Sequence, residues 1–439
     1  MKVNILKLPV MSASLAFLLL ASSGCSTSTN SQDTPQAANN PIKLQILSVE
    51  QTEKPEGPAE KALADAYVAQ HPNIKIEFIA VPYNDLYKKV TALATGGDMP
   101  DAFFNTPEFM RNANKMDITT DLTGLLNKDY LAEFYPNMIN EASIDGQLQF
   151  LPWFATPQAL IYRGDWFEKE GLQAPETWDD FLKVAQKLTK DTNGDGTVDQ
   201  WGFGMIGTRN SSGAARFIPF LRTFGVEEIK QDQNGKWLTE LDKPQAKEAF
   251  QFFADLNNKY GVVPPGVLET GFPEVATMMA NNKIAMMISG PNAIGTITSQ
   301  NPDLKGKLYS APLPKKENHS ATFGLFGYSI SKSSKHKNEM ADFLKFLVNK
   351  ENSLKFNAIS GRLPTKIEVG KDQQLSSPDF AGFVKAIDYA FPAPAFDAYS
   401  QFNDIVTEAY QLMISKSATT DDAVGKAVNR ANELIAKQK

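Results

Sequence analysis

Cysteine and histidine are scarce in this sequence of 439 residues, which contains one cysteine and three histidines. A lone cysteine has no partner within the chain, so an internal disulfide is excluded. The histidines, His71, His319 and His336, stand in polar, loop-like contexts beside proline, asparagine or lysine. Neither a Gly-x-Ser-x-Gly nucleophile elbow nor a His-Glu-x-x-His zinc helix occurs. Two common signatures of hydrolytic enzymes are therefore missing.

Positive charge is not concentrated in any segment of the chain. The sequence has 44 lysines and arginines against 50 aspartates and glutamates, which gives a formal net charge of -6. Because these charges are dispersed and form no basic stripe, nucleic acid is not an expected partner. Long apolar runs are also rare, since only residues 8–20 form one. The mature protein is therefore expected to be soluble apart from any lipid it carries.

Residues 1–24 have the pattern of an export signal. Lys2 and Lys7 precede the apolar run, and the run ends in the small residues at 21–24. The run is too short to span a bilayer comfortably, so the segment is expected to be cleaved. Cys25, the only cysteine, follows directly.

Cys25 and the small residues before it resemble the lipobox of bacterial lipoproteins, although Ser22 stands where those proteins usually have leucine. The resemblance implies that the Cys25 thiol is acylated and becomes the mature amino terminus. The alternative is a leftover thiol. Residues 25–40 are rich in Ser, Thr, Asn and Gln without apolar periodicity, which predicts a flexible tether. About 400 residues remain, too many for one core, so two lobes are expected.

The globular part begins near Pro41 with a strand, a helix and a strand in close succession. Residues 44–49 form a short apolar run. The helix is expected to begin at Pro58, because the apolar residues after it recur at intervals of three and four. Residues 74–78 then alternate between apolar and charged side chains, as a strand does. This order predicts a βαβ unit with a parallel sheet.

The alternation of helix and strand continues along the chain and predicts doubly wound α/β lobes. A helix is expected over residues 84–94 and a strand over residues 102–104. In such sheets the ligand lies beyond the carboxyl ends of the strands. The loops at these ends are residues 50–56, 105–108 and 289–292. Later helices with one apolar side are expected over residues 178–189, 244–258, 339–349 and 402–414.

Seven short segments carry a family resemblance through their order and spacing, although each alone is weak. The segments are residues 93–101, 151–153, 159–163, 177–181, 285–291, 324–331 and 361–364. Taken together, they resemble the family-one extracellular solute-binding proteins of ABC transporters, which include the maltose-binding proteins. The resemblance covers nearly the whole mature chain.

The resemblance implies a type II periplasmic-binding-protein fold, in which two doubly wound α/β lobes are joined by a hinge of several chain crossings. It places residues 41–154 and 312–375 in the first lobe, and residues 155–311 and 376–439 in the second lobe. It also implies that the lobes enclose a ligand and deliver it to the permease subunits of an ABC importer. A monomer is expected.

The resemblance guides the choice of residues that could bind a carbohydrate. Sugars have apolar ring faces edged by hydroxyl groups, so their sites pair aromatic side chains with rigid hydrogen-bonding groups. Trp153 and Phe326 are the aromatic candidates, for which the alternative is a place in the core. Arg362 supplies a fixed fork of donors. Further candidates, chosen by loop or family position, are Glu50, Asn105, Arg209, Asn292 and Tyr399.

Residues 191–199 have the spacing of a calcium loop. Oxygen-bearing side chains stand at the first, third, fifth and ninth places, and Gly196 supplies the turn at the sixth. The twelfth place is Gly202, so the usual bidentate glutamate is missing. A structural calcium ion is predicted, and a plain turn between two elements is the alternative. The ligands would be Asp191, Asn193, Asp195, Thr197 through its carbonyl, and Asp199.

Two other interpretations of the function are open at this point. A secreted glycosidase would need two carboxyl groups facing each other, and acidic residues are plentiful enough to supply them. Because the other catalytic signatures are missing, no enzyme activity is expected and no catalytic residue is assigned. A receptor for another cargo is the second interpretation. A polyamine would suit Glu50, Glu53 and Glu56, whereas an anion such as a phosphodiester would suit Arg209 and Arg362.

Overall fold

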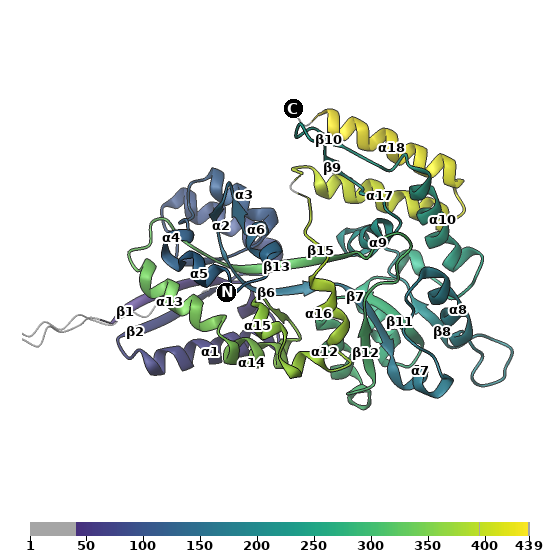
Figure 1. The fold of residues 1–439 in the computed structure, drawn as a ribbon, viewed down its shortest axis with the longest axis horizontal. Helices are drawn as coiled ribbons and strands as arrows, with labels where there is room; N and C mark the ends of the chain where they lie inside the picture. The colour runs from purple at the N-terminus through teal and green to yellow at the C-terminus, as the bar shows by residue number, and fades with distance from the viewer. Residues whose placement is uncertain (1–40, 395, 438–439) are drawn as a thin grey trace, which may run out of the picture. The chain divides into compact units, whose positions relative to one another are not determined.

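The computed structural model describes residues 41–394 and 396–437 (Figure 1). The export signal, Cys25 and the tether predicted for residues 1–40 lie outside the described residues. Residues 41–439 form one compact unit, and two separate sheets lie within it. We call the part built on the larger sheet the first lobe and the part built on the smaller sheet the second lobe. Among the described helices, none has both the length and the apolar character needed to cross a membrane.

The first lobe begins with the predicted βαβ unit. Strand β1 (Ile42–Ser48) pairs in parallel with β2 (Ile74–Ala80), and α1 (Glu56–Gln70) connects them. The helix buries Leu63 and Tyr67, which lie four residues apart and therefore on one face. The parallel pairing of the βαβ unit is thus confirmed, although α1 begins two residues before the expected proline.

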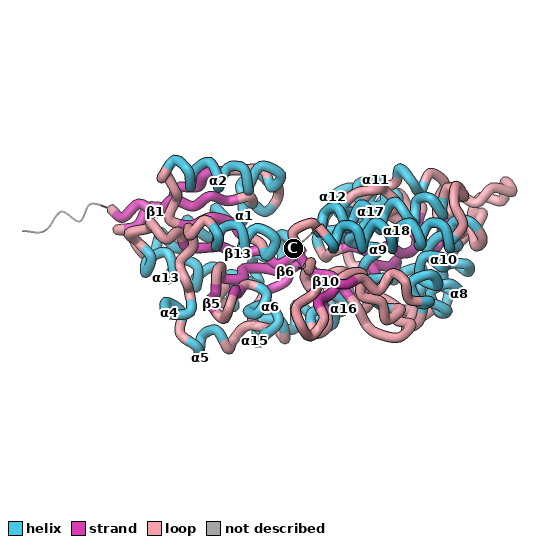
Figure 2. The backbone as a smooth tube through the Cα atoms, turned by 90° about the horizontal axis from the view of Figure 1, so that it is seen from above, coloured by secondary structure: helices cyan, strands magenta, loops and turns pink. Residues whose placement is uncertain are grey.

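The sheet of the first lobe is mixed, because antiparallel strands join its parallel part. Its order is β14-β6-β13-β3-β1-β2, and the short strand β15 pairs with β13. Figure 2 shows helices on both sides of this sheet, with α2 on one side and α13 on the other. The further elements of this lobe are α2 (Leu86–Gly96), β3 (Ala102–Asn105), α3 (Pro107–Lys115), α4 (Thr123–Leu126), α5 (Lys128–Leu131), α6 (Pro136–Glu141), β4 (Ser143–Ile144), β5 (Gln147–Leu148), β6 (Leu151–Pro157), β13 (Ala321–Ile330), α13 (Lys337–Leu347), α14 (Lys350–Ser360), β14 (Leu363–Pro364) and α15 (Ile367–Gly370).

The second lobe is built on a four-stranded sheet of order β12-β7-β11-β8. Strand β11 is parallel to β8 and antiparallel to β7. Its elements are β7 (Ala159–Arg163), α7 (Gly164–Glu170), α8 (Trp178–Leu188), β8 (Trp201–Gly204), α9 (Ser211–Thr223), β9 (Lys230–Gln231), β10 (Trp237–Leu238), α10 (Pro244–Asn258), α11 (Phe272–Ala280), β11 (Ile284–Ser289), α12 (Asn292–Gln300), β12 (Leu308–Ala311), α16 (Ala381–Ile387), α17 (Tyr399–Ile414) and α18 (Thr420–Ala436). Between α16 and α17, β15 (Ala390–Phe391) pairs with β13 of the larger sheet.

The helices expected in the later part of the chain are confirmed as α8, α10, α13 and α17, with small differences at their ends. Helix α8 illustrates why the sequence predicts them. Thr177 caps its first turn by accepting a hydrogen bond from the Asp180 amide at 3.1 Å. Trp178, Phe181 and Leu188 follow at helical spacing and are buried in the core of the second lobe.

Strands β6 and β13 pass between the lobes side by side. Gln158 alone separates β6 in the first sheet from β7 in the second, and its amide donates to the Thr322 carbonyl at 2.9 Å. Thr322 belongs to β13, which also pairs with β15 through Thr322 and Phe391. Figure 1 shows β6 and β13 running between the two groups of helices. The predicted α/β fold of two lobes is confirmed.

Candidate ligand-binding site

The end of β1 and the start of β14 bring two predicted residues together. Glu50 follows β1 directly, and Arg362 follows Gly361, whose φ of 72° ends α14 in the left-handed region. The guanidinium of Arg362 forms an ion pair with the Glu50 carboxylate. Its second terminal nitrogen lies 3.6 Å from a carboxylate oxygen of Glu56. Residues from two distant loops therefore meet at one point of the first lobe.

Burial makes this ion pair sensitive to the loss of either partner. The side chain of Glu50 is 2% exposed and that of Arg362 is 15% exposed. Burial lowers the pKa of Arg362 to about 10, so the guanidinium keeps its charge at neutral pH. Burial also raises the pKa of Glu56, and the neighbouring Glu53 charge adds to the rise. The guanidinium therefore depends on Glu50 for most of its compensation.

Aromatic rings extend from this ion pair toward the surface. The Arg362 guanidinium lies 4.5 Å from the centre of the Phe154 ring. Phe326 stacks on Phe154 with ring centres 5.2 Å apart and an angle of 28°. Tyr83, which is 41% exposed, meets the edge of Phe326 at 6.3 Å. Half-buried Phe326 and exposed Tyr83 therefore form an aromatic surface next to a charged pair, the combination that sugar sites use.

Two other candidates of the first lobe have the contacts of core residues. Trp153 is 2% exposed, and its indole stacks on Phe356 with ring centres 4.4 Å apart. Asn105 is fully buried and donates from Nδ2 to Ser329 Oγ at 2.8 Å, while its Oδ1 accepts from the Thr106 amide at 2.8 Å. Thr106 in turn caps α3. These contacts give Trp153 and Asn105 positions beneath the aromatic surface rather than on it.

The second lobe contributes the turn that follows β11. A Cβ atom at Gly290 would lie 3.8 Å from Thr156 Cβ, and one at Gly361 would lie 3.0 Å from the Pro291 carbonyl oxygen. The turn therefore lies against β6 and against the loop that carries Arg362. Asn292, a predicted ligand residue, is half-buried at the start of α12 just beyond this contact.

Arg209 and Tyr399 are held by other partners in the second lobe. Arg209 donates to both carboxylate oxygens of Asp404 at 2.6 and 2.7 Å, and it also pairs with Glu408 at 2.7 Å. Tyr399 Oη donates to Glu228 at 2.9 Å. Burial, together with the Glu228 carboxylate, raises the pKa of Tyr399 well above its ordinary value. The polar groups of both residues are therefore already engaged.

Sequence reasoning missed two residues of this region. Tyr83 stands after β2, a loop that the sequence analysis did not select. Arg216 lies in α9, the helix that follows β8, and donates from Nη2 to Ser289 Oγ at the end of β11 at 3.1 Å. The sequence signal that could have identified Arg216 is that α9 begins shortly after the end of β8. The same signal led to the choice of Arg209, which lies in the loop between these two elements.

The predicted calcium loop has its carboxylates bonded to its own backbone. Asp191 accepts from the Gly194 and Gly196 amides, each at 2.7 Å, and these bonds, with Gly196 contributing most, lower its pKa. Asp199 accepts from the Thr192 amide at 2.9 Å. Gly196 has a φ of 85°, as the predicted sharp turn requires.

The donor set of the loop is rich in oxygen, which suits calcium. Within residues 41–394 and 396–437, no group of three or more His, Cys, Asp and Glu side chains is arranged to hold a metal ion. The carboxylates of Asp191, Asp195 and Asp199 serve the loop's own amides and hydroxyls instead. A carboxylate has lone pairs left after such bonds, so calcium binding by this loop stays a prediction.

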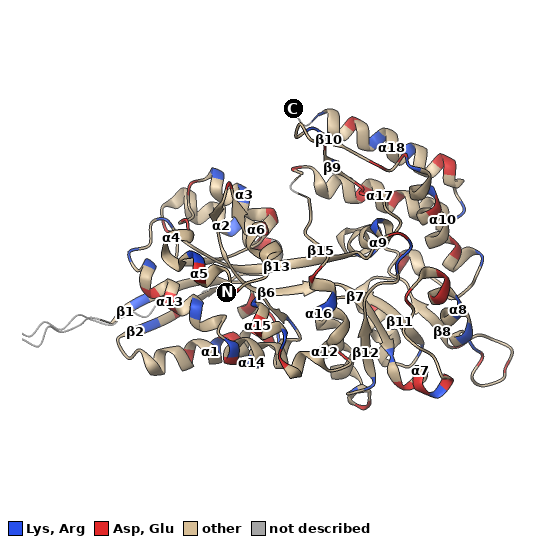
Figure 3. Cartoon of the chain, viewed as in Figure 1, with Lys and Arg blue, Asp and Glu red and all other residues tan. Residues whose placement is uncertain are grey.

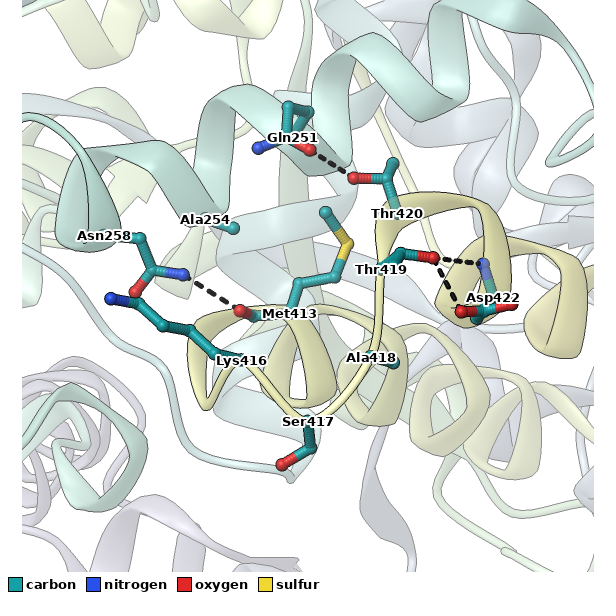
Figure 4. Close-up of a pocket in the computed structure, with 10 residues that line it drawn as sticks. All are labelled: Gln251, Ala254, Asn258, Met413, Lys416, Ser417, Ala418, Thr419, Thr420 and Asp422. Atoms are coloured by element: carbon teal, nitrogen blue, oxygen red, sulfur yellow. Dashed lines mark hydrogen bonds between the residues drawn. The ribbon is translucent and has the colours of Figure 1, made fainter.

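A separate cavity of about 490 Å³ lies in the second lobe between α10 and the turn that joins α17 to α18 (Figure 4). Its polar groups bond one another: Asn258 Nδ2 donates to the Met413 carbonyl at 2.9 Å, and Thr420 pairs with Gln251. Because these groups are satisfied and Glu50, Phe326 and Arg362 do not line it, we assign it no role in binding.

Figure 3 shows acidic and basic residues interspersed over both lobes.

Residues 51–353 match the bacterial extracellular solute-binding protein family, and the chain belongs to that family. The arabinooligosaccharide-binding protein of Bacillus subtilis (strain 168) is 26% identical over 311 residues, covering 69% of this chain and 68% of that protein. The maltose-bound structure of T. maritima MalE3 is 28% identical, with a TM-score of 0.74, and the match covers 90% of this chain and 100% of that one.

A solute-binding protein of Thermotoga lettingae TMO bound with alpha-D-tagatose has the same fold, with a TM-score of 0.74 at 23% identity over 90% of this chain and 100% of that one. The predicted family is thus confirmed. Membership places the protein outside the cytoplasm. The family and these relatives are binding proteins rather than enzymes.

Replacing Glu50 with glutamine should lower the free energy of unfolding by about 3 kcal/mol, because it leaves the Arg362 charge buried without its main partner. The value lies at the low end for a broken buried pair because Glu56 remains nearby. Urea denaturation of the full chain measures it. Lys61→Gln is the control, since it removes the exposed pair with Asp65 and should cost less than about 1 kcal/mol. Equal losses in both variants would contradict this account.

Calcium should raise the melting temperature of the full chain relative to chelator, because an ion that binds only the native state stabilises it by about 2.7 kcal/mol at a hundredfold excess over Kd. Asp191→Asn should abolish the difference, since it removes one charge from the first ligand position. Differential scanning calorimetry makes the measurement, with magnesium as the control ion. Identical melting curves in calcium and in chelator would mean that residues 191–199 form a plain turn.

Proposed function

We propose that the protein captures a carbohydrate between its two lobes and delivers it to the permease of an ABC importer. One observation carries the proposal: the aromatic surface of Phe326 and Tyr83 lies beside the buried pair of Arg362 and Glu50. The names of the relatives support it, because one binds arabinooligosaccharides and another was solved with maltose.

The arrangement suits a sugar for physical reasons. The face of a pyranose ring is apolar and stacks on an aromatic ring, which here would be Phe326 or Tyr83. The hydroxyl groups at the ring edge need donors and acceptors that are already in place. Arg362 is held by Glu50 and by the face of Phe154, so ordering its guanidinium costs little on binding. Trp153 and Asn105 would act beneath this surface by positioning β6 and the start of α3.

The short connection between the two sheets would allow the lobes to close around a ligand. Only Gln158 separates the strands of the two sheets at the first crossing, so a change of few backbone angles there would rotate one lobe against the other. A ligand selects the closed form only if it gains contacts in that form which the open form lacks. Phe326 from the first lobe and the turn at residues 289–292 from the second are the surfaces that would supply them.

We also propose that the Cys25 thiol carries a lipid that tethers the protein to the outer face of the cell membrane. The proposal rests on the sequence, where Cys25 directly follows an export signal and precedes a polar segment. A tethered receptor stays close to its permease, which raises its effective concentration there.

Phe326→Ala should weaken carbohydrate binding by about tenfold or more, because it removes one stacking surface whose loss costs about 1.5 kcal/mol or more. A thermal-shift screen of the full chain against a carbohydrate library identifies the sugar, and calorimetric titration gives the affinities. Phe252→Ala is the matched control, since Phe252 is half-buried in α10 of the second lobe.

Equal affinity in Phe326→Ala and the original protein would remove Phe326 from the site. Stabilisation by a polyamine or a phosphodiester, with no sugar active, would overturn the carbohydrate assignment. Release of reducing ends in the same wells would show a glycosidase. The last two outcomes are read from the same plates as the screen, and the first from the calorimetric titration.

Cys25→Ser should move the protein from the membrane fraction to the soluble extracytoplasmic fraction, because a hydroxyl group does not accept the thioether-linked lipid. Cell fractionation followed by immunoblotting measures the shift, and incorporation of labelled palmitate measures the lipid. Ser26→Ala serves as the control at the neighbouring position. An unchanged distribution with no label in the original protein would show that Cys25 is a leftover thiol.

A further inference from the structure

Arg216 differs from the other arginines in the partners of its guanidinium. Its Nη1 donates to the carbonyl and hydroxyl oxygens of Ser212 at 3.2 and 3.0 Å, and its Nη2 donates to Ser289 Oγ at 3.1 Å. Its Nε is buried and has no acceptor among the described residues. The ring of Phe272 lies 5.7 Å away. All the oxygens that meet this cation are therefore neutral.

The remaining buried or partly buried arginines have carboxylate partners. Glu50 neutralises Arg362, and Glu228 neutralises Arg222 at 2.7 Å. No carboxylate of the described residues lies within ion-pair distance of Arg216, and burial alone lowers its pKa to about 10. The arginines that form ion pairs are Arg163, Arg209, Arg222, Arg362 and Arg430.

Arg216 is connected to the candidate site through short contacts. Ser289 is its partner at the end of β11, and the next residue, Gly290, lies against Thr156 of β6. A Cβ atom at Gly324 would lie 2.8 Å from Thr156 Oγ1 and 2.6 Å from the ring of Phe326. The guanidinium therefore stands where the second lobe meets the strands that carry the aromatic surface.

An unpaired and largely buried cation is costly, because desolvation is not offset by a neighbouring negative charge. A ligand with a negative charge would supply the missing counterion. The side chain of Arg216 is partly exposed, so a ligand at the surface can reach it. Arg362 offers no such charge, because Glu50 already compensates it.

We infer that the captured carbohydrate is acidic and that a carboxylate on its ring pairs with Arg216, which makes Arg216 a specificity-determining residue. This inference rests on the proposed function. A carboxylate carries one negative charge and matches one guanidinium, with hydrogen bonds about twice as strong as those to neutral groups. A phosphate monoester carries about 1.5 to 2 negative charges and would leave part of its charge without a partner.

The test compares sugars that differ only in the acidic group. The probes are galacturonic acid and galactose, glucuronic acid and glucose, and digalacturonic acid with its methyl ester. Glucose 6-phosphate and glucose 6-sulfate form two further arms, which distinguish a carboxylate from other anions. Calorimetric titration of the full chain should show that an acid binds about 10- to 100-fold more tightly than its neutral partner. This comparison needs no variant.

Arg216→Gln should remove this preference by weakening the binding of the acid far more than that of its neutral partner. Arg216→Lys should keep part of the preference, because it keeps the charge but loses the planar fork. The melting temperature of the ligand-free Arg216→Gln protein should stay equal or rise, since an uncompensated charge is removed. A purely structural arginine would lower it. Arg430→Gln is the matched control, because Arg430 pairs with Glu408 on the outer helices.

Neutral and acidic partners that bind within about threefold of each other would overturn the inference and leave the proposed function standing. Equal weakening of both partners in Arg216→Gln would do the same, since Arg216 would then serve hydroxyl groups. A preference for the phosphate or sulfate arm would replace the carboxylate by another anion and overturn the assignment. If no carbohydrate of either kind binds, the proposed function fails and the inference fails with it.

Discussion

The pairing of β6 with β13 is the interaction on which the rest of the structure depends. The two strands run antiparallel from Phe323 opposite Pro157 to Tyr328 opposite Leu151, and they carry the chain between the lobes. Their register places Phe326 opposite Phe154, so that the two rings stack while Phe326 stays partly exposed. Because side chains alternate along a strand, a shift by one residue would turn this ring to the other side of the sheet.

The buried and partly buried arginines differ in whether a carboxylate neutralises their charge. In the first lobe the charge of Arg362 is met by Glu50, and the pair is buried against Phe154. In the second lobe Arg222 is met by Glu228, which also accepts from Tyr399. Arg216, also in the second lobe, meets neutral oxygens only. A protein that captures solutes needs some unsatisfied groups in its open form, because a fully satisfied surface gains little from a ligand.

Much of the fold could be predicted from local patterns. The βαβ unit and α10 follow from apolar spacing within one element, and Thr177 marks the start of α8 because its hydroxyl caps the first turn. The site was harder to predict. Glu50 and Arg362 were each selected for their loops, but their pairing across more than 300 positions has no local signal. Arg209 was also selected for its loop, but its guanidinium forms an ion pair with Asp404 on α17.

By itself the sequence determined the alternation of strands and helices and the dispersed charge, because each depends on neighbouring residues or on composition. Only the tertiary structure decided which aromatic side chains are exposed. Trp153 and Phe326 are both aromatic in the sequence, yet Phe356 covers the first while the second is partly exposed. Likewise, whether Arg216 has a counterion depends on every chain segment packed around it. Burial and charge compensation are sums over contacts distant in sequence, so no local pattern encodes them.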